Sequence, residues 1–150
     1  MKILAWSYII LLLSSVTHAQ EIAFPERESD RSNFELTIES IPENKGEVRI
    51  AIFNSEEKYK EKEDPVHAVV LKVDGKKLTW SDDSFPFGEY AIAVYHDKNE
   101  NGELDTNFLG IPKEAYGFSN NARGRFGPAS WEAAHFKVDS NQTKMVIEVK

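Results

Sequence analysis

The chain contains no cysteine, and this absence removes several classes of protein at once. Without thiols there is no disulfide framework, no thiolate zinc site, no cysteine nucleophile and no N-terminal cysteine for lipid attachment. The chain also has no basic excess, because 18 Lys and Arg residues stand against 25 Asp and Glu residues. Nucleic-acid binding depends on neutralising phosphates with basic side chains, so the composition argues against a nucleic-acid partner.

Long apolar runs are missing from the sequence except at its beginning. Lys2 is followed by an uncharged, mostly apolar segment over residues 3–16, and Thr17 and Ala19 place small residues before a cleavage point. This is the layout of a secretory signal peptide. The apolar run has about 14 residues, fewer than the roughly 20 that a membrane-spanning helix needs. We therefore interpret residues 1–19 as a signal peptide and expect a periplasmic or secreted protein with no membrane span after cleavage.

The rest of the chain divides into a short lead-in and one domain. Residues 20–32 are charged, contain Pro25 and lack periodicity, which is typical of a flexible segment. Residues 33–150 are long enough for one domain of ordinary size. A chain of this size buries about two thirds of its unfolded surface, so it needs neither a metal ion nor a disulfide to fold.

Short segments in which apolar and polar residues alternate fill most of residues 33–150, and this pattern predicts strands with one buried face. They cover residues 34–39, 46–54, 68–73, 76–80, 89–95, 135–139 and 144–149. Asp74-Gly75 between two of them predicts a hairpin. The charged residues 55–64 fit either a short helix capped by Ser55 or a solvated loop. The pattern predicts an all-β fold: an antiparallel β-sandwich, immunoglobulin-like or prealbumin-like, of about seven strands.

Residues 97–105 carry the motif with the clearest chemical content. Oxygen-bearing side chains stand at positions 1, 3, 5 and 9 of this segment, with glycine at position 6: Asp97, Asn99, Asn101, Asp105 and Gly102. This spacing matches the beginning of an EF-hand-type calcium loop. Calcium prefers six to eight oxygen ligands, and alternate side chains of a tightly curled loop converge on one point. At position 7, Glu103 is expected to contribute its backbone carbonyl oxygen.

The match is incomplete, because Phe108 stands where the motif places a bidentate Glu. Only two of the four side-chain ligands are carboxylates, so we expect a weak affinity of about 10⁻⁴–10⁻³ M. A further oxygen would come from Glu114, Asp82, Asp83 or a backbone carbonyl within residues 106–121. The alternative is a loop without a metal, since Asn-Gly is itself a favoured turn.

The calcium-type loop is the first part of a longer motif. Residues 96–121 read HDKNENGELDTNFLGIPKEAYGFSNN, and Phe126-Gly127-Pro128 follow. This resembles a bacterial secreted family known as domain of unknown function 2141, with the signature H-D-x-N-x-N-G-x-x-D-T-N-x-x-G-x-P-x-E-x-x-G-F-S-N-N. The likeness covers about residues 34–150. It implies a periplasmic or secreted β-sandwich, and it implies no activity, because the family has none assigned.

The segment after the calcium-type loop offers further candidates. Arg123 and Arg125 fit either an anion clasp or ordinary solvated charges. Aromatic residues that could form a sugar-binding platform, or pack within the protein, are Trp80, Tyr116, Phe126 and Trp131. His96 fits best as a structural hydrogen-bonding residue beside the loop. Ser119 lacks the strand–elbow–helix setting of an esterase nucleophile, which argues against an enzyme.

These observations predict an exported, non-enzymatic β-sandwich protein with a calcium-binding loop and a binding or structural role at the cell envelope. The expected partners are a calcium ion and, beyond it, a glycan or an envelope protein. The alternative is a carbohydrate- or peptide-binding module that uses the loop of residues 106–131.

Overall fold

The computed structural model describes residues 30–150. The predicted signal peptide, residues 1–19, and most of the predicted lead-in, residues 20–32, lie outside the described residues. The first strand begins at Arg31, so the last two residues of that lead-in, Arg31 and Ser32, are part of a strand.

Residues 30–150 form eight strands, two short α-helices and one 3-10 turn. In chain order they are β1 (Arg31–Glu39), β2 (Glu47–Phe53), α1 (Glu56–Glu61), β3 (His67–Lys72), β4 (Leu78–Pro86), β5 (Gly88–Asp97), β6 (Tyr116–Phe118), η1 (Ser119–Asn121), α2 (Trp131–Ala134), β7 (Phe136–Val138) and β8 (Gln142–Glu148). The predicted all-β fold is confirmed. Of the two alternatives for residues 55–64, a short helix or a solvated loop, the structure has the helix, and the hydroxyl of Ser55 accepts a hydrogen bond from the backbone N–H of Lys58. Neither of the described α-helices has the length and hydropathy that crossing a bilayer requires.

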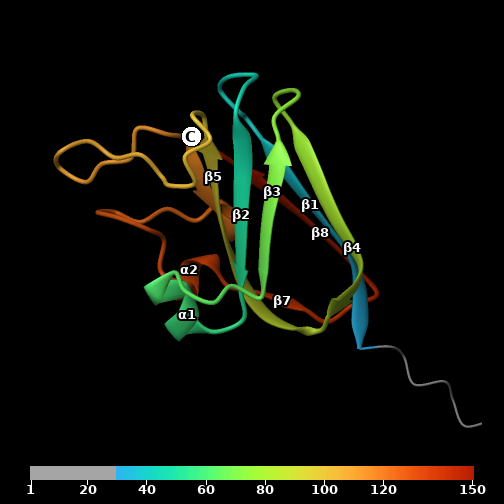
Figure 1. The fold of residues 1–150 in the computed structure, drawn as a ribbon. Helices are drawn as coiled ribbons and strands as arrows, with labels where there is room; N and C mark the ends of the chain where they lie inside the picture. The colour runs from blue at the N-terminus through green and yellow to red at the C-terminus, as the bar shows by residue number, and fades with distance from the viewer. Residues whose placement is uncertain (1–29) are drawn as a thin grey trace, which may run out of the picture.

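The strands form two sheets that face each other as an open sandwich (Figure 1). One sheet has the order β4-β1-β8, and the other has the order β3-β2-β5-β6, with β7 also pairing with β5. All pairs are antiparallel except β1 and β8, which run parallel. On one side the sheets are linked, because Tyr116 and Lys150 exchange two backbone hydrogen bonds of 3.1 Å.

The predicted Asp74-Gly75 hairpin is wrong. Strand β3 pairs with β2, whereas β4 pairs with β1 in the other sheet. Gly75 therefore lies in a connection that carries the chain from one sheet to the other. An Asp-Gly turn favours a sharp reversal, but it does not determine which strands pair after it.

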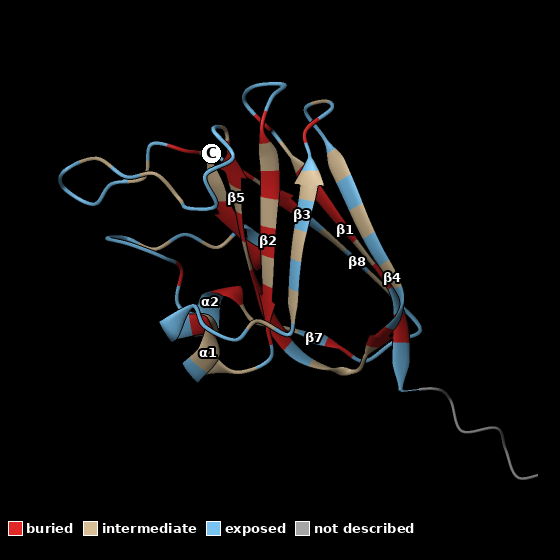
Figure 2. Cartoon of the chain, in the orientation of Figure 1, coloured by how far each residue is buried: buried red, intermediate tan, exposed pale blue. Residues whose placement is uncertain are grey.

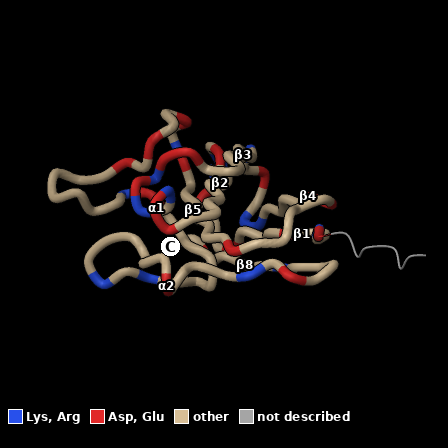
Figure 3. Tube along the Cα trace, turned by 90° about the horizontal axis from the view of Figure 1, so that it is seen from below, with Lys and Arg blue, Asp and Glu red and all other residues tan. Residues whose placement is uncertain are grey.

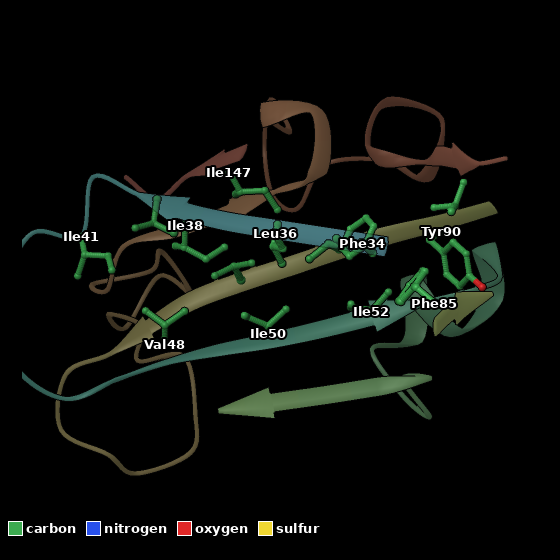
Figure 4. Packing of buried hydrophobic residues seen from close by; sticks show 14 of the residues in the cluster. Phe34, Leu36, Ile38, Ile41, Val48, Ile50, Ile52, Phe85, Tyr90 and Ile147 are labelled. Carbon is green, nitrogen blue, oxygen red and sulfur yellow. The ribbon is translucent and has the colours of Figure 1, made fainter. Parts of the chain in front are cut away.

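The main core lies between the two sheets and is formed by alternate residues of the central strands (Figure 4). In β1 these are Phe34, Leu36 and Ile38, each at most 1% exposed. Phe34 stacks on Phe85 of β4, with ring centroids 4.6 Å apart. Burial alternates along β2 in the same way, as the bands of colour in Figure 2 show. The period-two pattern of the sequence thus specifies which face of each strand turns inward.

A second, smaller core covers the opposite face of β2 and β5. There Tyr59 of α1 packs against Phe53 and Phe118 with edge-to-face ring contacts. Tyr59 is buried and donates a hydrogen bond to the carbonyl of Ala129, at 2.9 Å. This cluster fixes one end of the five-stranded sheet, while the calcium-type loop leaves the other end.

Candidate metal-binding loop

The calcium-type loop begins where β5 ends. Asp97 is the last residue of β5, and its neighbour in β2 is Glu47. Residues 98–115 then leave the sheet before the chain returns in β6 (Figure 1). Sheet pairing therefore fixes the first predicted ligand in a rigid strand and places the other ligands in the loop that follows.

Asp97 is completely buried and accepts three hydrogen bonds. Its Oδ2 accepts from Nε of Arg49 and from the backbone N–H of Gly102, both at 2.8 Å, and its Oδ1 accepts from the backbone N–H of Asn101 at 3.1 Å. Burial is the largest single influence on this carboxyl group and opposes its ionisation, but the hydrogen bonds from the backbone and from Arg49 together outweigh it. The pKa of Asp97 is therefore lowered. Gly102 has φ +85°, a conformation that favours glycine and lets the loop curl around this carboxylate.

The other predicted side-chain ligands gather around Asp105. Its Oδ2 accepts a hydrogen bond from Nδ2 of Asn99 at 2.8 Å, and its Oδ1 accepts one from Nδ2 of Asn101 at 3.0 Å. The amide oxygens of Asn99 and Asn101 accept from backbone N–H groups two residues further on, at 3.2 and 2.9 Å. The structure thus brings Asp97, Asn99, Asn101 and Asp105 into one hydrogen-bonded cluster. Glu103 belongs to the same turn through its backbone N–H.

Glu114 accepts hydrogen bonds from the backbone at both ends of the candidate site. Its side chain is buried; Oε1 accepts from the backbone N–H of Lys98 at 2.8 Å and Oε2 from the backbone N–H of Asp105 at 3.0 Å. Both oxygens therefore tie together the beginning and the end of the candidate site. Glu114 is one of the alternative sources of a further oxygen ligand, and its hydrogen bonds make it a clamp for the loop backbone. Asp82 and Asp83, the other predicted acids, lie on β4 in the opposite sheet.

The turn between β1 and β2 packs directly under this loop. Gly46 has φ +73°, and a Cβ atom there would lie 2.3 Å from the carbonyl oxygen of Asp97. Next to it, the carbonyl of Lys45 is 2.7 Å from Nε2 of buried His96. His96 therefore has the structural role that the sequence suggests, although its Nδ1 has no partner among the described residues. Nothing local in the sequence indicates that Gly46 supports the loop, because the contact arises only from the sheet.

Basic side chains neutralise part of the negative charge at the candidate site. Arg49 binds both Asp97 and Glu47, and its pKa is raised, chiefly by the hydrogen bond with Asp97. Glu100 is paired with Lys72 on β3. Within residues 30–150 no three His, Cys, Asp or Glu side chains gather as a metal site, so any cation here would depend on Asn oxygens and carbonyls as well.

The residues after the loop are structural. The buried hydroxyl of Ser119 accepts from the backbone N–H of Ile92 at 2.9 Å and donates to the carbonyl of Ala134. Asn121 connects this turn to β8, accepting from the backbone N–H of Glu148 at 2.8 Å. These bonds explain why a small, polar, turn-forming sequence follows β6.

Of the two alternatives for Arg123 and Arg125, an anion clasp or ordinary charges, the contacts of Arg123 do not favour the clasp. Arg123 donates to the carbonyls of Tyr116 and Glu148, at 2.9 and 3.1 Å, and its guanidinium lies 5.4 Å from the centre of the Tyr116 ring. It is therefore engaged in holding the β6–β8 junction.

The four candidate aromatic residues do not form one platform. Trp80 packs against Phe34 at the main core, whereas Trp131 packs against Tyr59 in the second core. Tyr116 lies beside Phe118, with ring centroids 5.9 Å apart. Phe126 is separate from them all and is 97% exposed.

Comparison of the sequence with protein families gives a match, which includes both the strands and the calcium-type loop. The family model described as "Uncharacterized protein conserved in bacteria (DUF2141)" matches residues 36–146. The chain belongs to this family. The match begins within β1 and ends within β8, so the resemblance inferred from the loop motif is confirmed over residues 36–146. Searches of curated proteins and of solved structures found no significant match.

Proposed function

We propose that this DUF2141 protein is an exported, non-enzymatic β-sandwich in which residues 97–105 bind one calcium ion, with a structural or binding role at the cell envelope. The observation that carries the proposal is the convergence of Asp97, Asn99, Asn101 and Asp105 in one cluster. The export part rests on the sequence of residues 1–19. The non-enzymatic part is supported by Ser119, whose hydroxyl is buried and already engaged.

The contacts around Asp105 suggest how a cation would bind. Two amide NH₂ groups, from Asn99 and Asn101, direct partial positive charge at this carboxylate. Calcium would replace them if both amides turned so that their oxygens faced Asp105. An amide oxygen has two lone pairs, so it can coordinate a cation and still accept a backbone N–H. The carbonyl of Glu103 and water would complete the coordination.

The affinity of this loop for calcium should be weak. Two carboxylates contribute charge to the site, and Arg49 lies 2.8 Å from one of them. The positive guanidinium offsets part of the attraction between Asp97 and a divalent ion. We expect a Kd of about 10⁻⁴–10⁻³ M, the range of extracellular calcium modules.

Calorimetry and thermal unfolding test the proposal. Calcium added to chelator-treated protein should titrate one site, and calcium at ten times Kd should stabilise the fold by about 1.4 kcal/mol. Asp105→Asn and Asn101→Ala should each abolish both effects while keeping the fold, because neither side chain is buried. Asp139→Asn is the matched control, since Asp139 is an exposed acid that, within residues 30–150, pairs only with Lys137. No heat of binding up to several millimolar, or binding unchanged in Asp105→Asn, would refute the calcium site.

A further inference from the structure

Two loops expose large apolar side chains to solvent. Phe108 is 95% exposed, Leu109 68% and Ile111 56%, and in the second loop Phe126 is 97% exposed. We call these four residues the apolar loop tips. Both loops extend to the same side of the molecule, which is the left in Figure 1 and again in Figure 3, where the view is turned by 90°. The other large apolar residues exposed within residues 30–150 are valines, at most 49% exposed.

The first tip is a compact turn built around Asn107. Oδ1 of Asn107 accepts from the backbone N–H groups of Leu109 and Ile111, at 2.9 and 3.0 Å. Its backbone N–H donates to the carbonyl of Ile111 at 2.8 Å, and its carbonyl accepts from Gly110 at 2.9 Å. These bonds pair four backbone N–H groups inside the turn, those of Asn107, Leu109, Gly110 and Ile111, while the side chains of Phe108, Leu109 and Ile111 are exposed. The turn can therefore approach an apolar environment with these four donors already paired.

In the second loop, which carries Phe126, the two arms lie in contact at the base. A Cβ atom on Gly124 would lie 2.2 Å from the carbonyl oxygen of Gly127, so the two arms of the loop touch. Arg125 and Phe126 lie between these glycines and form the end of the loop. Phe126 therefore has no room to fold back between the arms, and its ring stands in solvent.

The two loop tips themselves carry more basic than acidic residues, although acids flank them: Glu103 and Asp105 before the first tip and Glu132 after the second. Residues 106–131 contain three basic residues and one acid, Glu114, in a chain of net charge −7. Glu114 is buried in the loop clamp, and Arg123 is bound to two carbonyls. Within residues 30–150 the side chains of Lys113 and Arg125 form no hydrogen bond or ion pair. Two basic groups thus accompany the apolar loop tips.

We propose that the apolar loop tips bind the surface of a lipid bilayer that carries anionic headgroups. Phe, Leu and Ile would enter the boundary between headgroups and acyl chains, while Lys113 and Arg125 would contact lipid phosphates. The shape favours a bilayer over a protein, because two separate convex tips would need two pockets at a fixed spacing, whereas a fluid surface adapts to them. This proposal does not depend on calcium.

Vesicle co-sedimentation in the presence of a chelator tests the proposal. Residues 20–150 should be used, because residues 30–150 contain both sheets and both cores, and the apolar segment of residues 3–16 would itself bind lipid. We expect binding to vesicles of phosphatidylglycerol and phosphatidylethanolamine, weaker binding to phosphatidylcholine alone, and a decrease with salt. Phe108→Ser and Phe126→Ser should each weaken binding about tenfold, and the double variant about a hundredfold.

Val70→Ser is the matched control, because Val70 is 49% exposed on β3 and lies outside the tips; its binding should stay within twofold. Circular dichroism should show the same fold in all variants, since the altered side chains are solvated. No binding at millimolar lipid, or equal binding by the double variant, would overturn the proposal. Sedimentation without vesicles provides a further test. Dimers that form with increasing concentration and disappear in the double variant would show that the apolar loop tips bind a second copy of the chain, and would overturn the proposal that they bind a bilayer.

Discussion

Replacing Glu114 by alanine removes the buried carboxylate that holds both ends of the candidate site. Two backbone N–H groups, those of Lys98 and Asp105, lose their acceptors. Each hydrogen bond to a charged acceptor contributes about 1.5–3 kcal/mol, and water admitted beside the shortened side chain recovers part of the loss. We therefore expect Glu114→Ala to lower the free energy of unfolding by about 2–4 kcal/mol and to weaken calcium binding at least tenfold.

Urea unfolding followed by circular dichroism measures the first quantity, and calorimetry measures the second. Glu114→Gln keeps one acceptor oxygen and should lose less stability than alanine, which gives a folded variant if the alanine variant is too unstable. Glu103→Ala is the control within the same loop: its side chain is exposed and only its carbonyl is proposed to bind calcium, so stability should change by less than about 0.5 kcal/mol. A Glu114→Ala protein as stable as Glu103→Ala would show that the clamp does not hold the loop.

Two further changes test the surroundings of the site. Gly46→Ala places a Cβ atom 2.3 Å from the carbonyl oxygen of Asp97, so it should lower the free energy of unfolding in urea by at least about 2 kcal/mol. Gly75→Ala is the control, because its Cβ would meet no atom closer than 4.0 Å, and it should not destabilise the protein in this way. Equal effects of the two substitutions would contradict the close contact at Gly46. Burial raises the pKa of Tyr59 to about 12, so its stabilising contribution is complete below pH 10 and falls as the pH rises towards 12, by about 3 kcal/mol in total. Tyr59→Phe should remove this alkaline loss, and an unchanged pH profile of unfolding would refute the assignment.

The positions of the strands were predictable because the alternation of apolar and polar residues follows the alternation of buried and exposed positions along a strand. In β1 and β2 every second residue is apolar, and these residues form the main core. Strand partners were not predictable in the same way. Asp74-Gly75 indicates a reversal, yet the strands on either side of it join different sheets, because pairing depends on contacts far apart in the sequence.

The same limit applies to the candidate site. Spacing within nine residues predicts that the side chains of Asp97, Asn101 and Asp105 converge, since a curled loop determines their directions. Arg49 and Gly46 come to the loop only through the pairing of β2 with β5 and the turn before it, for which the local sequence has no signal. Glu114 could be identified as an acid near the site, but its role as a backbone clamp depends on where the loop closes.

We propose above that residues 97–105 form one oxygen-lined site for a divalent cation. Titrating chelator-treated protein with calcium while recording the backbone and side-chain amide NMR signals tests it most directly. We expect saturable shifts confined to this loop, with the NH₂ signals of Asn99 and Asn101 changing most as the two amides release Asp105. Signals that stay unmoved up to several millimolar calcium, or that drift without saturation across the acidic surface, would contradict it.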